Sequence, residues 1–279
     1  TMDGSTATVL PGGHEVVSFG EEPAVVPDPA FHVIGQRDLR AAVLFPTRHD
    51  GSALPVLLDP YGGPHAQRVQ RARSVFLASQ WFADQGFAVV VADGRGTPGR
   101  GPAWERAVAG DLAGPVLDDQ VDALHALAEA DDRLDLGRVA IRGWSFGGYL
   151  AALAVLRRPD VFHAAVAGAP VTDWRLYDTH YTERYLGHPD EAPAAYAATD
   201  LCAEAANLTR PLLLIHGLAD DNVVVAHTLA LSRALLEAGR PHRVLPLSGV
   251  THMTPQEEVA ENLLLVQLAF LREALGIDG

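Results

Sequence analysis

Two hydrophobic patterns alternate along the chain. Short apolar runs rich in Val, Leu and Ala are followed by segments whose apolar residues recur every three or four positions. The first pattern is typical of strands buried in a parallel sheet, and the second of amphipathic helices that cover such a sheet. The alternation predicts an α/β fold with a mostly parallel, twisted sheet and helices on both faces. The predicted strands are Leu39–Phe45, Leu54–Asp59, Ala88–Ala92, Arg138–Ile141, His163–Ala167, Pro211–His216 and His242–Leu247.

Local signals place the predicted helices between these strands. Val116–Ala130 begins just after Pro115, and proline is favoured in a first helical turn. Ala226–Ala238 ends at Gly239, and glycine is typical immediately after a helix. The other predicted helices are Tyr149–Arg158 and Glu258–Leu275.

The start of the chain differs in composition from the rest. Residues 1–24 are rich in Pro and Gly and are expected to be a tail or linker, whereas residues 25–279 are expected to form one domain. Thr1 precedes Met2, which natural initiation would not leave, so the chain is expected to be an excised piece of a longer protein. No secretory signal is visible, and no apolar run approaches the roughly 18 residues that span a bilayer. A cytoplasmic protein without membrane contact is therefore expected.

Composition narrows the chemistry. The 279 residues are 48% apolar and 20% charged, which indicates a globular chain. The net charge of −14 disfavours nucleic acid as a partner, because nucleic-acid affinity comes mostly from neutralising phosphates. All 21 basic residues are Arg, so Schiff-base chemistry, lysine-activated serine nucleophiles and the P-loop are excluded. Cys202 is the single cysteine, which excludes an internal disulfide and a thiolate metal cluster.

A serine nucleophile is predicted at the junction of a strand and a helix. Gly143-Trp-Ser-Phe-Gly147 is a G-x-S-x-G motif that follows the strand Arg138–Ile141 and precedes a predicted helix, the context that this motif requires. Glycines beside a sharply turned serine leave room for the strand and helix to approach, and the turn exposes the Ser145 hydroxyl. The alternative is an ordinary glycine-rich turn between a strand and a helix.

A serine needs a base and an orienting acid, which in this type of fold follow it in the order Ser, acid, His. Asp220 and Asp221 follow one predicted strand, and His252 follows the next, so both groups lie at the carboxyl edge of the sheet. Spacing does not decide between the two aspartates, and either could instead cap the helix Ala226–Ala238.

An oxyanion stabiliser is expected from the loop after the strand Leu54–Asp59. The loop begins Pro60-Tyr61-Gly62-Gly63-Pro64, and the Tyr61 hydroxyl could act there beside the backbone amide of Phe146. Such a Tyr-Gly-Gly-Pro sequence is equally typical of a simple tight turn.

Five motifs together resemble the prolyl oligopeptidase family of serine peptidases, and within it the dipeptidyl peptidase IV branch. The resemblance covers roughly Leu54 to Met253 and implies an α/β-hydrolase fold in residues 25–279. The motifs are DPYGGPHAQRV at 59–69, DGRGTPGRG at 93–101, GWSFGGYLAAL at 143–153, APVTDWRLYDTHYTERYLG at 169–187 and LLIHGLADDNV at 213–223.

The resemblance implies a role for each matching residue. Ser145 corresponds to the nucleophile, Asp220 to the acid, His252 to the base and Tyr61 to the oxyanion tyrosine. Asn222 corresponds to the asparagine that binds the carbonyl of the substrate's N-terminal residue. The pocket for the penultimate residue is matched by Val171, Trp174, Tyr177, Tyr181 and Val223, with Phe146 where the family usually has tyrosine.

The aromatic residues of this pocket also have a simpler interpretation. Trp174, Tyr177, Tyr181 and Tyr185 are spaced by three, four and four residues, which places them on one face of a predicted helix. An aromatic stripe of this kind usually packs into a core.

The sequence departs from the family in two respects. His65 and His180 stand where other family members carry different residues. The β-propeller of the family, which supplies paired glutamates for the substrate's free amine, has no counterpart in this sequence. Weak activity on dipeptidyl-proline amides and reduced discrimination against N-blocked substrates are therefore expected.

The leading hypothesis is a serine peptidase that cleaves after a penultimate proline or small residue, with a peptide substrate and no cofactor or metal. One alternative is an esterase or acylaminoacyl peptidase with the same catalytic groups. The alternative of another class is a non-catalytic binding scaffold, although such a protein has no need to retain all the catalytic positions. The sequence leaves the oligomeric state open, including a homo-oligomer.

Overall fold

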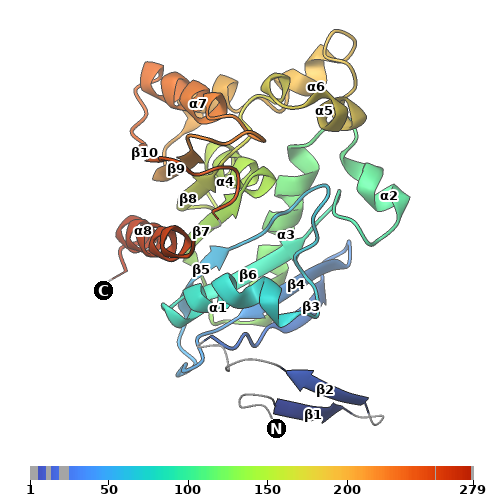
Figure 1. Ribbon diagram of the computed structural model, residues 1–279, viewed down its shortest axis with the longest axis vertical. Coiled ribbons are helices and arrows are strands. Elements are labelled where there is room, and N and C mark those ends of the chain that lie inside the picture. Colours follow the sequence, from blue (N-terminus) through green and yellow to red (C-terminus); the bar gives the residue numbers. More distant parts are fainter. Residues whose placement is uncertain (1–5, 11–13, 19–24, 255, 278–279) are drawn as a thin grey trace.

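An eight-stranded sheet forms the centre of the molecule (Figure 1). The computed structural model describes residues 6–10, 14–18, 25–254 and 256–277. The strands are β3 (Ala30–Ile34), β4 (Leu39–Leu44), β5 (Leu54–Leu58), β6 (Ala88–Asp93), β7 (Leu134–Trp144), β8 (Ala164–Gly168), β9 (Leu212–Gly217) and β10 (Arg243–Leu247). Their order is β10-β9-β8-β7-β5-β6-β4-β3. Pairing is parallel from β10 to β6 and antiparallel for β6–β4 and β4–β3. The predicted α/β fold with a mostly parallel sheet is confirmed.

The seven predicted strands are all present, and the structure adds one to the central sheet. β3 was not predicted because it is an edge strand with four of its five residues exposed. It therefore lacks the buried apolar run by which the other strands were recognised. β7 also begins earlier than expected, at Leu134. Within the residues expected to be a tail, β1 (Thr6–Leu10) and β2 (His14–Ser18) pair as a separate antiparallel hairpin.

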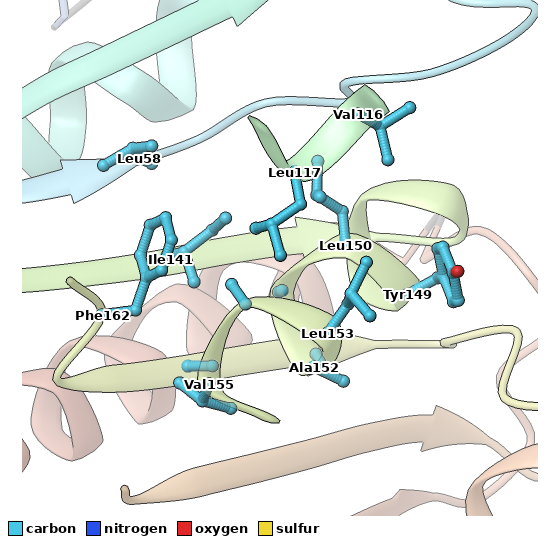
Figure 2. Close-up of a cluster of buried hydrophobic side chains, with 14 of the residues drawn as sticks. Leu58, Val116, Leu117, Ile141, Tyr149, Leu150, Ala152, Leu153, Val155 and Phe162 are labelled. Atoms are coloured by element: carbon cyan, nitrogen blue, oxygen red, sulfur yellow. The ribbon is translucent and has the colours of Figure 1, made fainter. Parts of the chain in front are cut away.

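Alternating side chains build a core on each face of the sheet. On β5, Val56 and Leu58 face one core, whereas Leu57 faces the other. The first core is covered by α3 (Gly114–Ala130), α4 (Phe146–Arg157) and α7 (Ala226–Glu237). The second is covered by α1 (Leu77–Asp84) and α8 (Glu257–Leu275). Figure 2 shows Leu58 and Ile141 from the sheet beside Leu117, Leu150 and Leu153 from two helices of the first core.

The loops after the parallel strands meet at one edge of the sheet. The long connection from β8 to β9 adds α5 (Thr179–Leu186) and α6 (Pro193–Ala197), which project beyond this edge at the upper right of Figure 1. The short helix α2 (Pro102–Glu105) lies below them in the same view. Every predicted site residue falls at this edge, as expected for a parallel sheet. Among the described residues, no helix has the length and apolar character needed to cross a membrane.

Candidate active site

Ser145 occupies a sharp turn between β7 and α4. Its backbone has φ 60° and ψ −117°, a conformation that is strained for a residue with a side chain. Two neighbours make the turn possible, because a Cβ atom on Gly143 would lie 2.2 Å from the carbonyl oxygen of Gly147. The Ser145 N–H donates to the Gly168 carbonyl on β8 at 2.9 Å. The sharp turn predicted at Ser145 between a strand and a helix is therefore present.

Tyr61 lies beside this turn. A Cβ atom on Gly147 would lie 2.8 Å from the Pro60 carbonyl oxygen and 3.6 Å from Tyr61 Cα, so the start of α4 packs directly on the Tyr61 loop. Burial raises the pKa of the Tyr61 phenol to about 12, the nearby Tyr177 adds to this rise, and a hydrogen bond with Ser145 opposes it. The phenol is thus a neutral hydrogen-bond donor at ordinary pH. Phe146 is the first residue of α4, so its N–H has no acceptor within the helix.

His252 is paired with Asp220 and not with Asp221. Nδ1 of His252 lies 2.8 Å from Oδ2 of Asp220, whose side chain is fully buried. The other Asp220 oxygen accepts the N–H groups of Asn222 at 3.0 Å and Val223 at 2.9 Å. Asp221 is exposed. Neither aspartate caps α7, because the residue before that helix is Val225 and no side chain caps it.

The loops that carry the acid and the histidine are joined to each other. A Cβ atom on Gly217 would lie 2.4 Å from the Val250 carbonyl oxygen, so the two loops approach as closely as backbone allows. The same carbonyl accepts the Ala219 N–H at 3.0 Å. The Trp144 indole N–H donates to the His252 carbonyl at 2.7 Å. The nucleophile strand therefore also holds the histidine loop.

The described contacts of His252 include a hydrogen bond to Asp220 but none to Ser145. Catalytic hydrogen bonds are often long in proteins without bound substrate and shorten when the substrate is present. The structure brings Ser145, Asp220 and His252 to one sheet edge.

His216 is a buried neighbour of Asp220 that was not identified from the sequence as a site residue. Its Nε2 lies 2.7 Å from the Val223 carbonyl, an acceptor, so Nε2 carries the proton and Nδ1 accepts from the Thr228 hydroxyl at 2.7 Å. Nε2 is also 3.5 Å from Oδ2 of Asp220. Burial lowers the pKa of His216, which keeps the ring neutral. The one signal in the sequence was a polar residue inside the apolar strand LLLIHG.

An aromatic wall of Trp174, Tyr177 and Tyr181 adjoins Phe146, the residue after Ser145. Trp174 is buried, its ring lies 5.9 Å from the Phe146 ring, and it stacks on Tyr181 at 5.8 Å with planes 7° apart. Tyr177 packs edge-on against both Trp174 and Tyr181. The Tyr177 hydroxyl donates to Asn222 Oδ1 at 3.4 Å, which joins the wall to the acid loop. Two further predicted pocket residues, Val171 and Val223, are buried.

The predicted single helix for these aromatic residues is wrong. Trp174 belongs to a short 3-10 helix, Tyr177 is extended, and α5 begins only at Thr179. Asp178 causes the break, because its side chain accepts the Tyr181 N–H at 3.2 Å and so caps the start of α5. The rings nevertheless form one cluster, with one stacked pair and edge-on or tilted contacts between the others.

His227 on α7 lies beside this wall, with its ring 6.5 Å from the Tyr177 ring. Its Nδ1 accepts the Thr172 N–H at 3.1 Å, and the Thr172 hydroxyl donates to the His227 carbonyl at 2.8 Å. Burial, with a smaller contribution from the neighbouring His216, lowers the pKa of His227 to about 4. The neutral imidazole therefore serves as an acceptor inside the fold.

The two unusual histidines lie at the rim of the wall. His65 has a positive φ of 76°, and its ring lies 4.8 Å from the Tyr181 ring. His180 is exposed on α5. In the described part of the chain, no group of three or more His, Cys, Asp and Glu side chains is placed to hold a metal ion.

Comparison with known proteins supports the family resemblance. Residues 73–278 match the model of the prolyl oligopeptidase family. The chain is 41% identical over 231 residues to dipeptidyl peptidase 8 of Homo sapiens, covering 81% of this chain and 26% of that protein. It is 41% identical over 184 residues to a probable dipeptidyl-aminopeptidase B of Aspergillus clavatus, covering 65% of this chain and 20% of that protein.

A solved structure shows the same architecture. The crystal structure of Porphyromonas gingivalis dipeptidyl peptidase 4 matches with a TM-score of 0.83 at 32% sequence identity. The match covers 89% of this chain and 36% of that one. The chain thus spans between about a fifth and just over a third of the length of these proteins.

Proposed function

Because the chain belongs to the prolyl oligopeptidase family, we propose that it is a serine peptidase that cleaves after a penultimate proline or small residue. The observation that carries this proposal is the assembly at one sheet edge of a strained Ser145, a buried Asp220 paired with the partly exposed His252, and a neutral Tyr61 donor. Each component has a defined task in acyl transfer.

In the proposed mechanism, Ser145 attacks the substrate carbonyl while Nε2 of His252 removes the hydroxyl proton. Asp220 accepts from Nδ1, which fixes the tautomer that leaves Nε2 free as a base. The Tyr61 hydroxyl and the Phe146 N–H stabilise the oxyanion. His252 then protonates the leaving amine, and water hydrolyses the acyl-enzyme by the same steps in reverse.

The aromatic wall supports the proposed specificity. Tyr177 and Tyr181 are partly exposed and pack on the buried Trp174, so they offer apolar ring surface, and a proline ring packs well on such surfaces. Asn222 is exposed and beside Tyr177, which supports a role in binding the carbonyl of the preceding residue.

A fluorophosphonate probe tests the nucleophile. It should label the chain once, at Ser145, and Ser145→Ala should abolish both labelling and hydrolysis. Labelling that persists in Ser145→Ala would disprove the assignment.

A substrate panel tests the specificity. Alanyl-proline and glycyl-proline nitroanilides should be cleaved faster than short acyl esters, with only a small preference over their N-acetylated counterparts. Preference for the esters would identify an esterase, and preference for the acetylated peptides an acylaminoacyl peptidase. No turnover of any substrate by a labelled, folded chain would favour a binding role.

A further inference from the structure

A buried ion-pair cluster lies directly beneath the Tyr61 loop. Asp59, two residues before Tyr61, is 2% exposed. Its Oδ1 accepts from Arg142 at 2.9 Å, and its Oδ2 accepts from Arg68 at 3.1 Å and from the Ser79 hydroxyl at 2.7 Å. Three side chains, those of Arg142, Arg68 and Ser79, thus donate to the Asp59 carboxylate.

The cluster fixes both ends of the loop. Asp59 opens the segment and Arg68 closes it, so the ion pair between them ties the loop into a ring around Tyr61. Asp93, at the end of β6, accepts the backbone N–H groups of Arg68 at 3.0 Å and Val69 at 2.8 Å. The far end of the loop is therefore anchored to the sheet by backbone as well as by side chain.

The cluster also ties the loop to the nucleophile. Arg142 lies on β7, three residues before Ser145. Its Nε donates to Gln267 Oε1 on α8 at 3.0 Å, and its guanidinium lies 4.6 Å from the centre of the Phe82 ring. Because these contacts hold Arg142 firmly, Asp59 is fixed relative to the strand that presents the nucleophile. Its pKa is lowered despite burial, because Arg142 and Arg68 favour the carboxylate.

We propose that Asp59, Arg142 and Arg68 are positioning residues that set the distance between the Tyr61 hydroxyl and Ser145. This inference rests on the proposed function, since it assigns the cluster an effect on the oxyanion that Tyr61 stabilises. A misplacement of about 1 Å in such a donor can cost about 100-fold in rate. A cluster that acts through Tyr61 has no effect once the Tyr61 hydroxyl has been removed.

A double-mutant cycle tests the inference in the full chain with glycyl-proline nitroanilide. Asp59→Asn should lower kcat by about 10- to 100-fold with KM within about threefold. In the Tyr61→Phe background the same substitution should lower kcat by less than about threefold. Equal losses in both backgrounds would overturn the inference, because a merely structural role does not depend on the Tyr61 hydroxyl.

A more conservative pair of variants guards against misfolding. Asp59→Asn leaves the Arg142 charge without its partner in the interior, whereas the Arg68 side chain is 28% exposed and tolerates change. Arg68→Gln should therefore fold and show the same dependence on Tyr61. Arg157→Gln is the matched control, because Arg157 is also 28% exposed and pairs with Glu204. It should leave kcat unchanged.

The outcomes separate this inference from the proposed function. If Ser145→Ala retains full activity, or Tyr61→Phe has a normal kcat, the proposed mechanism fails. If both behave as proposed but Arg68→Gln reduces kcat equally with and without the Tyr61 hydroxyl, only the positioning role fails.

Discussion

Nδ1 of His252 lies 2.8 Å from Oδ2 of Asp220. The other oxygen of this carboxylate accepts two backbone N–H groups. The backbone bonds from Asn222 and Val223 to Oδ1 orient the carboxylate and leave Oδ2 for the imidazole. Since the carboxylate can only accept, Nδ1 must carry a proton and Nε2 must be free. This geometry distinguishes two adjacent aspartates that spacing alone left equivalent.

Asp220→Asn should therefore lower kcat by about four orders of magnitude, because the asparagine amide favours the wrong histidine tautomer. Asp221→Asn is the matched control and should change kcat by less than about threefold, since Asp221 is exposed. Steady-state kinetics on one proline substrate measures both. A larger loss in Asp221→Asn would mean that the wrong aspartate has been assigned.

Tyr61→Phe should reduce kcat by about 100- to 1,000-fold and leave KM nearly unchanged, because the lost hydrogen bond forms mainly in the transition state. Tyr185 belongs to the same aromatic cluster, and the kcat of Tyr185→Phe should stay within about threefold of the wild-type value. With a Tyr61 pKa of about 12, the wild-type kcat should show no loss from tyrosine ionisation up to about pH 10. A normal kcat in Tyr61→Phe would leave only backbone amides as oxyanion donors.

Asn222→Ala should lower kcat/KM for dipeptidyl substrates by about 10- to 100-fold, the effect of losing one hydrogen bond to a substrate carbonyl. Its backbone N–H, which donates to Asp220, is retained in the variant. Nitrophenyl acetate has no second carbonyl, so its hydrolysis should be unchanged. Parallel losses on both substrates would indicate damage to the acid loop instead.

Acid should destabilise the fold through His227. The folded-state pKa is lowered from 6.5 to about 4, so the unfolded chain binds more protons between these values. The contribution of the neutral His227 ring to the free energy of unfolding is complete above pH 6.5 and falls as the pH drops towards 4. The expected loss from this residue is about 2 kcal/mol between pH 7 and pH 5.

Urea unfolding of the wild type and of His227→Gln at both pH values checks this expectation. The variant should be less stable at pH 7 but should lose about 2 kcal/mol less on going to pH 5. Equal losses in the two proteins would show that His227 is not the group responsible.

Much of the fold and of the site could be predicted from local pattern. Apolar runs marked the buried strands, and the elbow around Ser145 follows from glycine spacing between a strand and a helix. The order of Ser145, Asp220 and His252 follows from chain order along a parallel sheet. These features depend on neighbours within a few residues or on a topology that few alternatives satisfy.

What escaped prediction depends on distant contacts. Arg142 and Asp59 are 83 residues apart, and nothing in either segment identifies the other as its partner. His216 looked like one polar residue in a strand, and its tautomer is set by residues on another element. The break in the aromatic stripe had a local cause, since Asp178 is a favoured N-cap, but apolar periodicity alone hides it.

The close approach of Gly217 to Val250 makes the acid loop and the histidine loop a single cooperative unit. Local opening of either loop separates Asp220 from His252, so inactivation on mild warming should follow the opening of this unit and not global unfolding. The Ala219 amide, bonded to the Val250 carbonyl, reports that opening directly. Its hydrogen-exchange protection would measure the fraction of molecules in which Asp220 and His252 are paired.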